Sequence, residues 1–221
     1  MRCSPLKRAL AIPEKLGSVI MQLVFDIREH LNIVWKLAEQ ISVKRRGHNE
    51  FISAMFFVSI SHCDAVQTLV EKKNFASAFS LVRPTLENTF RAVWLRKCAN
   101  KDQANKAIYK DKWNAVGKNI ELIEEEYEDS MLFSKLWEML KPFVHDFTHG
   151  GSELTSRHIS KGGFITPTID DQEVRFLLQL TVLVSTYVLA ELVELSGEKQ
   201  FEPYVEKLAN QTCTKVFGTD C

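Results

Sequence analysis

The sequence has no excess of charge of either sign and few cysteines, and each absence excludes a class of protein. Its 221 residues carry 28 Lys and Arg against 28 Asp and Glu. A protein that wraps an extended nucleic acid needs a basic excess to neutralise phosphates, so that class is not favoured. The five cysteines are odd in number and form no CxxC pair, which argues against a disulfide framework and a structural zinc site. We therefore expect free thiols in a reducing cytoplasm.

Signals for secretion and for membrane insertion are also missing from the sequence. Residues 1–5 are basic, but no apolar core follows them. The most apolar run, residues 176–190, is shorter than the roughly 20 residues that a bilayer requires. It also contains Gln179 and Thr181 and leads directly into Glu191. We interpret it as a buried core helix and predict no contact with membranes.

Helical periodicity dominates what the sequence does contain. Apolar residues recur at spacings of three and four, and Pro and Gly lie at the breaks. Pro84 lies inside such a pattern and should kink its helix, whereas Asp170 with Glu173 fits a capping box. The fourth predicted helix is the most polar, which is typical of a solvated outer helix or of a partner surface. We predict helices over residues 13–46, 49–72, 75–99, 102–128, 130–149, 170–195 and 201–216.

No internal repeat or low-complexity linker divides the chain. Helices joined by short connections favour an antiparallel bundle. The predicted fold is therefore all-α, an antiparallel bundle of about six to seven helices, in a single domain that spans residues 1–221.

The first candidate site is a row of charges on the third predicted helix. Arg83, Glu87 and Arg91 are spaced by four and therefore share one face. Two guanidiniums beside one carboxylate leave N–H donors for an anion such as a phosphate or a carboxylate. The alternative is a surface ladder of individually weak ion pairs.

The second candidate site is the end of the fifth predicted helix. His145 and His149 share one face there, and Gly150 and Gly151 follow at once. Such a histidine pair suits general acid–base chemistry near neutral pH, or a metal if a third ligand approaches in space. The glycines would let the chain turn sharply and expose backbone N–H groups to a ligand. Alternatively, both histidines only hydrogen-bond the backbone at the helix end.

The third candidate site is the connection over residues 150–167, which is long for a compact bundle. Arg157 within it is a further candidate for anion binding, and a solvated tether is the alternative. No phosphate-binding GxxxxGK[ST] loop is present, and we predict no cofactor and no bound metal. His62, Cys63 and Asp64 lie mid-helix, where a core polar cluster is the favoured interpretation.

Two motifs carry a resemblance to a known group of proteins. Residues 77–87 (SAFSLVRPTLE) with the following RAVWL, and residues 145–151 (HDFTHGG), resemble a family of uncharacterised bacterial helical proteins. The resemblance covers roughly residues 61–195 and implies that these polar positions belong together. The architecture is also distantly similar to HEPN bundles, many of which are dimers that act on nucleotides or RNA in toxin–antitoxin and phage-defence systems. The Arg-to-His spacing of the HEPN ribonuclease motif is missing here.

These observations predict that the third and fifth helices face each other. Arg83, Glu87 and Arg91 would then meet His145 and His149 in one partly buried pocket. We predict that the protein binds an anionic ligand, which is a small molecule, a nucleotide or a nucleic-acid end such as that of an RNA. We expect the protein to be cytoplasmic, and the resemblance implies a homodimer. In an enzymatic version the two histidines and Glu87 are catalytic, and the arginines stabilise developing charge. In the alternative, the protein is a non-catalytic interaction or regulatory module whose polar row fixes helix register.

Overall fold

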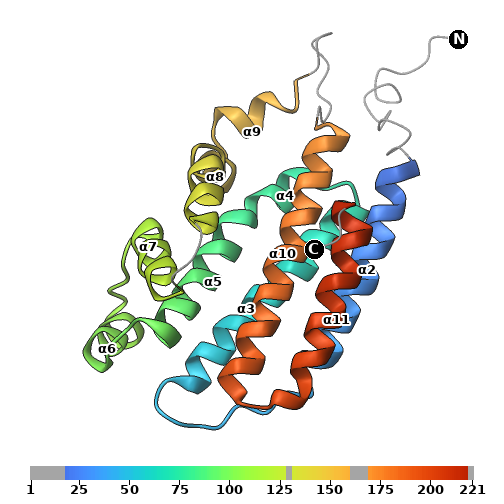
Figure 1. Cartoon of the computed structure of the whole chain (residues 1–221). Helices are drawn as coiled ribbons and strands as arrows, with labels where there is room; N and C mark the ends of the chain where they lie inside the picture. Colours follow the sequence, from blue (N-terminus) through green and yellow to red (C-terminus); the bar gives the residue numbers. More distant parts are fainter. Residues whose placement is uncertain (1–17, 128–130, 160–168, 219–221) are drawn as a thin grey trace, which may run out of the picture.

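The computed structural model describes residues 18–127, 131–159 and 169–218, and it is all-α as predicted (Figure 1). Two of the predicted helices are each divided into a pair, and a short helix lies within the predicted long loop. The elements are α2 (Ser18–Ala38), α3 (Asn49–Glu71), α4 (Phe75–Ser80), α5 (Val82–Lys97), α6 (Lys101–Lys110), α7 (Val116–Glu126), α8 (Leu132–His149), α9 (Ser152–Ser156), α10 (Asp171–Ser196), the 3-10 turn η1 (Lys199–Phe201), α11 (Glu202–Thr212) and the π-helical turn η2 (Cys213–Phe217).

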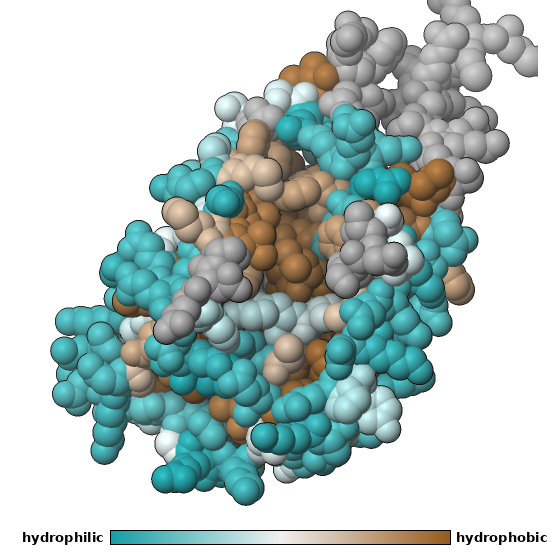
Figure 2. All heavy atoms as spheres, viewed as in Figure 1, coloured by the Kyte–Doolittle hydropathy of each residue, from teal (hydrophilic) through white to brown (hydrophobic). Residues whose placement is uncertain are grey.

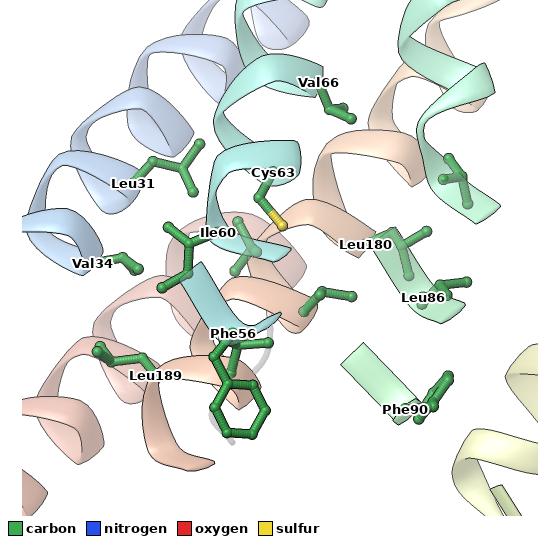
Figure 3. Close-up of a cluster of buried hydrophobic side chains, with 14 of the residues drawn as sticks. Leu31, Val34, Phe56, Ile60, Cys63, Val66, Leu86, Phe90, Leu180 and Leu189 are labelled. Atoms are coloured by element: carbon green, nitrogen blue, oxygen red, sulfur yellow. The ribbon is translucent and has the colours of Figure 1, made fainter. Parts of the chain in front are cut away.

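The core lies where α10 packs against α3 and α2, with α5 and α11 beside it (Figure 1). Leu31 of α2, Phe56 and Ile60 of α3 and Leu189 of α10 are all fully buried in this contact (Figure 3). Each such side chain contributes about 1.5–3 kcal/mol of transfer free energy. The spacing of these residues by three and four therefore both forms the helices and holds them together.

α10 is the only helix within the described ranges that is long and apolar enough to cross a membrane. Of its most apolar window, 67% is buried inside the bundle. Its start is fixed by the predicted capping box: Asp170 Oδ1 accepts from the backbone N–H groups of Gln172 and Glu173, and the Glu173 carboxylate accepts from the Asp170 N–H. The helix ends at Gly197, which has a left-handed backbone. These observations favour the interpretation as a core helix.

The predicted helix 75–99 is broken at Leu81, between α4 and α5. Pro84 explains the position, because a proline has no N–H and its ring clashes with the carbonyl four residues earlier, here that of Ser80. The single hydrogen of the Ser80 hydroxyl is shared between bonds to the carbonyl oxygens of Ala76 and Phe147, both at 2.9 Å. The second of these bonds fixes the break against α8.

The predicted helix 102–128 is also wrong as a single element. α6 ends at Lys110 and is capped by Asp111, which has a positive φ of 52°, and α7 begins only at Val116. The Trp113 indole N–H donates to the Asp111 carboxylate at 2.8 Å across this turn. The turn places Trp113 beside α5, where it becomes part of the site described below.

The predicted first helix, 13–46, ends earlier than expected, at Ala38. Ile41 is buried beyond the helix end, and the Ser42 N–H donates to the Glu198 carboxylate at 2.9 Å. This tertiary contact holds the chain in a loop up to Gly47. The predicted start of that helix at residue 13 lies outside the described residues, as does 160–167 of the predicted loop.

Candidate functional site

The break at Leu81 brings the start of α5 against the last turns of α8, so that the two predicted sites meet. Arg83 Nη1 lies 2.7 Å from His145 Nδ1, and Arg83 Nε donates to Glu87 Oε1 at 2.7 Å. The expectation that these two helices face each other agrees with this geometry. We call Arg83, Glu87, Arg91, His145 and His149 the α5–α8 cluster.

The contact between Arg83 and His145 fixes the state of the imidazole. A guanidinium has only donors, so His145 Nδ1 must accept the hydrogen bond. His145 is therefore the neutral tautomer with its proton on Nε2, and this N–H is one more donor on the cluster. The ring of His149 lies beside it, with the two centroids 4.7 Å apart.

Arg91 is the least satisfied member of the α5–α8 cluster. Its Nη2 lies 3.6 Å from Glu87 Oε2, and its guanidinium carbon lies 5.3 Å from the centroid of the Trp113 ring. Its Nε is buried without a hydrogen-bond partner in the described part of the chain, and so is the indole nitrogen of Trp94, one turn along the helix. Both of these atoms are donors. Trp113 was not predicted to be part of the site, because the residue was expected to lie within a continuous helix over residues 102–128.

The α5–α8 cluster is a half-open face, which differs from the partly buried pocket that we predicted. The three α5 side chains are partly exposed, and both histidines are exposed. Glu87 is occupied by the two arginines, and no hydrogen bond joins it to His149 among the described side chains. The imidazoles lie on the solvent side of α8 because Val144 and Phe147 form its buried side.

Gly150 and Gly151 have clear structural roles at the end of α8. Gly150 has a φ of 67° and closes the helix in the left-handed region, where glycine is favoured. A Cβ on Gly151 would overlap the Asp146 carboxylate, whose other oxygen accepts from the Leu154 N–H at 2.9 Å. The N–H groups of both glycines bond the Asp146 carbonyl. Their predicted role as ligand-binding donors remains a prediction.

Arg157 is not brought to the α5–α8 cluster. It forms an ion pair with Glu173 at the start of α10, and its guanidinium carbon lies 5.5 Å from the centroid of the Phe147 ring. Phe147 belongs to the buried side of α8, so Arg157 lies on the side opposite the histidines. It borders an apolar cavity instead, which is discussed below.

The polar group at 62–64 is only partly a core cluster, because Cys63 is buried but His62 and Asp64 are half-buried, and His62 Nδ1 has no hydrogen-bond partner among the described residues. Asp64 pairs with Arg28 of α2 at 2.5 Å, and burial raises the pKa of the Cys63 thiol to about 12. Burial also lowers the pKa of His62. Within the ranges that the structure describes, no group of three or more His, Cys, Asp or Glu side chains is arranged to hold a metal ion.

A second charged network, which the sequence did not indicate, lies at the far end of α5. Arg96 Nε donates to Glu191 Oε2 at 2.7 Å and its Nη2 to Glu194 Oε2 at 2.8 Å. The Tyr127 hydroxyl donates to the other oxygen of Glu191. Burial, together with the nearby Glu191 charge, raises the pKa of both Tyr127 and Tyr187. We call Arg96, Glu191, Glu194 and Tyr127 the Arg96 network.

Comparison with known proteins identifies the family to which the chain belongs. Residues 56–215, from within α3 to within η2, match the model of a family of unknown function, DUF6988. The chain belongs to the DUF6988 family. The matched region contains the whole α5–α8 cluster and the whole Arg96 network. No curated protein and no solved structure matches the chain, so the similarity to HEPN bundles remains an expectation.

Proposed function

We propose that this DUF6988 protein binds a phosphate-bearing ligand, a nucleotide or a nucleic-acid end, at the α5–α8 cluster. The observation that carries the proposal is the excess of donors over acceptors there. Two guanidiniums share the single Glu87 carboxylate, and the buried Nε of Arg91 has no partner among the described residues. With His145 neutral, the three α5 charges leave a net positive charge facing solvent.

The unpartnered donors give the ligand a source of binding energy. A buried N–H without a partner costs about 1–3 kcal/mol, and an acceptor oxygen that reaches it removes that cost. Charge-assisted hydrogen bonds from a guanidinium to a phosphate contribute about 1.5–3 kcal/mol each. Arg83 and Arg91 are already held in place by Glu87, so little side-chain entropy is lost when a phosphate binds.

Trp113 supports a nucleotide over a simple phosphate. Its ring is partly exposed and packs on the Arg91 guanidinium, beside the proposed phosphate position. A base that stacks on an aromatic ring gains about 1–3 kcal/mol. We further propose, from the HEPN-like architecture that the sequence motifs lead us to expect, that such a ligand is handled in the cytoplasm, in a bacterial defence or toxin–antitoxin system.

The state of His145 favours binding over catalysis by that residue. Acting as a base at Nε2 would require the other tautomer, and therefore loss of the hydrogen bond from Arg83. In an enzymatic version, His149 is the better general base, because the Arg83 contact does not fix its tautomer.

The test is calorimetric titration with AMP, with a short RNA that carries a 5′-phosphate, and with adenosine as the uncharged control. We expect both phosphate ligands to bind and adenosine not to bind. Arg83→Ala and Arg91→Ala should each weaken binding by about tenfold or more, the equivalent of about 1.4 kcal/mol. Arg45→Ala is the matched control, because Arg45 is 84% exposed and lies outside the cluster.

Circular dichroism separates loss of binding from loss of fold. The helical signal of each variant should match that of the unchanged protein, and Arg83→Lys provides a second variant that keeps the charge but not the planar fork. Equal affinities for all variants, or no binding of either phosphate ligand by the folded protein, would refute the proposal. The alternative, a structural role for the row, predicts instead that Arg83→Ala unfolds the chain.

A further inference from the structure

An apolar cavity lies on the side of α8 that faces away from the histidines. It has a volume of about 330 Å³ and lies between α4 and α5, α8 and the start of α10. Four phenylalanines take part in the lining: Phe79, Phe143, Phe147 and Phe176. Figure 2 shows hydrophobic atoms at the bottom of a hollow on this face of the molecule. The cavity therefore opens to solvent and is distinct from the α5–α8 cluster.

The size of the cavity suits a small molecule. An apolar cavity of about 150 Å³ is enough to bind benzene, and natural ligand pockets begin at about 300 Å³. At about 330 Å³ this cavity has room for two fused aromatic rings. Met139 and Phe143 line this cavity and are both exposed. A ligand that fills the cavity would cover these apolar side chains.

The charged side chains at the cavity do not favour an anion. Arg157 is already paired with Glu173, and Asp170 adds a second carboxylate. The backbone N–H groups of Gln172 and Glu173, which would otherwise attract an anion at the start of α10, are both bonded by Asp170 Oδ1. The polar side of the cavity therefore has a net negative charge and no free helix-end donor at these two positions.

From these observations we infer that the cavity is a binding site for a mainly aromatic small molecule that carries no negative charge and is about the size of a fused bicycle. The four phenylalanine rings provide apolar area and offset or edge-to-face contacts for a flat ligand. This site is separate from the proposed phosphate site, because it is formed by the opposite side of α8.

Two fluorescent probes with the same aromatic skeleton test the inference. N-phenyl-1-naphthylamine is uncharged at neutral pH, and 1-anilinonaphthalene-8-sulfonate is its sulfonated counterpart. The uncharged probe should bind the folded protein with a rise in fluorescence, and about tenfold or more tightly than the sulfonate. No binding of the uncharged probe, or tighter binding of the sulfonate, would overturn the inference.

Substitutions that fill the cavity test whether the probe binds there. Val144 is buried and lines the cavity, so Val144→Phe should fill part of it and weaken binding of the uncharged probe by about tenfold. Val58→Phe makes the same change at an exposed position on α3 and should not alter binding. Val82→Phe fills the cavity from α5 if Val144→Phe fails to fold. Unchanged affinity in a folded cavity-filling variant would refute this location, and Arg83→Ala should leave probe binding intact.

Discussion

The two ends of α5 carry the same kinds of charged residue in opposite settings. Near its start, Arg83 is 28% exposed and shares one carboxylate with a second arginine. Near its end, Arg96 is 9% exposed and bonds Glu191, which is 4% exposed, as well as Glu194. At the first end donors exceed acceptors, whereas at the second end the guanidinium is matched by two carboxylates.

This difference separates a candidate binding surface from a structural connection. A charge removed from water must be paired at once, because an uncompensated buried ion costs several kcal/mol. A partly exposed arginine can leave its solvent-facing donors without a protein partner, because water satisfies them until a ligand arrives, whereas the buried Nε of Arg91 has no partner among the described residues. The Arg96 network joins α5, α10 and the end of α7, and the α5–α8 cluster faces solvent.

Removing one partner should therefore have its largest effect in the Arg96 network. We expect Glu191→Leu to lower the free energy of unfolding by about 3–5 kcal/mol, because Arg96 loses its most buried counter-ion. Arg83→Ala should cost at most about 1 kcal/mol, because its ion pair is partly exposed. Urea unfolding followed by tryptophan fluorescence measures both variants.

A double variant controls for the loss of packing at this position. Arg96→Met combined with Glu191→Leu replaces the ion pair by apolar side chains, and it should be more stable than Glu191→Leu alone. If Arg83→Ala were as destabilising as Glu191→Leu, the two ends of α5 would both be structural, and the comparison would fail.

The helical fold could be predicted because its cause is local. Apolar spacing marked α3 to within a residue, and Asp170 with Glu173 marked the start of α10. The turn between α6 and α7 could not be predicted, since it depends on Trp113 packing against Arg91, a residue of another helix. The early end of α2 depends in the same way on Glu198, which is distant in the chain.

The candidate site could be predicted only in part. The spacing by four placed Arg83, Glu87 and Arg91 on one face, and the contact of Arg83 with His145 agrees with the expected pairing of helices. The position of Arg157 could not be derived, because nothing in its local sequence indicates Glu173 as its partner. The pairing of Arg96 with Glu191 spans 95 positions and leaves no local pattern.

The comparison between buried and exposed charged groups also applies to the pH dependence of stability, through the buried His30. His30 is buried, and its ring nitrogens lie 2.9 Å from the Thr212 hydroxyl and 3.0 Å from the Ser185 hydroxyl. Burial lowers the pKa of His30 from 6.5 to about 4. As the pH falls below 6.5 the unfolded chain binds a proton before the folded one does, so stability is complete above that pH and decreases down to about 4.

The expected loss from His30 over this range is about 3 kcal/mol, because one pKa unit corresponds to about 1.4 kcal/mol. Urea unfolding at a series of pH values gives the slope for the unchanged protein. His30→Gln removes the titrating group, and its stability should depend less steeply on pH between 6.5 and 4. If the free energy of unfolding changed equally steeply with pH in both proteins, burial would not lower the pKa of His30, and this prediction would be wrong.

We expect the smallest change in stability at Glu194. This position tests whether burial or ion pairing determines how much a carboxylate stabilises the fold. Hydrogen bonds from Arg96 and Lys97 lower the pKa of Glu194 to about 2, although its side chain is 55% exposed. Its contribution is therefore present above pH 4.5 and is lost as the pH falls towards 2. Because solvent screens the pair, Glu194→Gln should cost less than about 1 kcal/mol at pH 7.

The difference between Glu194→Gln and the unchanged protein should shrink as the pH falls from 4.5, when the natural carboxylate also becomes protonated. Glu191 and Glu194 bond the same guanidinium from the same helix, and each has one further donor, Tyr127 for Glu191 and Lys97 for Glu194, so the largest difference between them is exposure. If Glu194→Gln were as costly as Glu191→Leu, pairing alone would determine stability. The partly exposed arginines at the start of α5 would then be structural too, because Glu87 pairs with both of them.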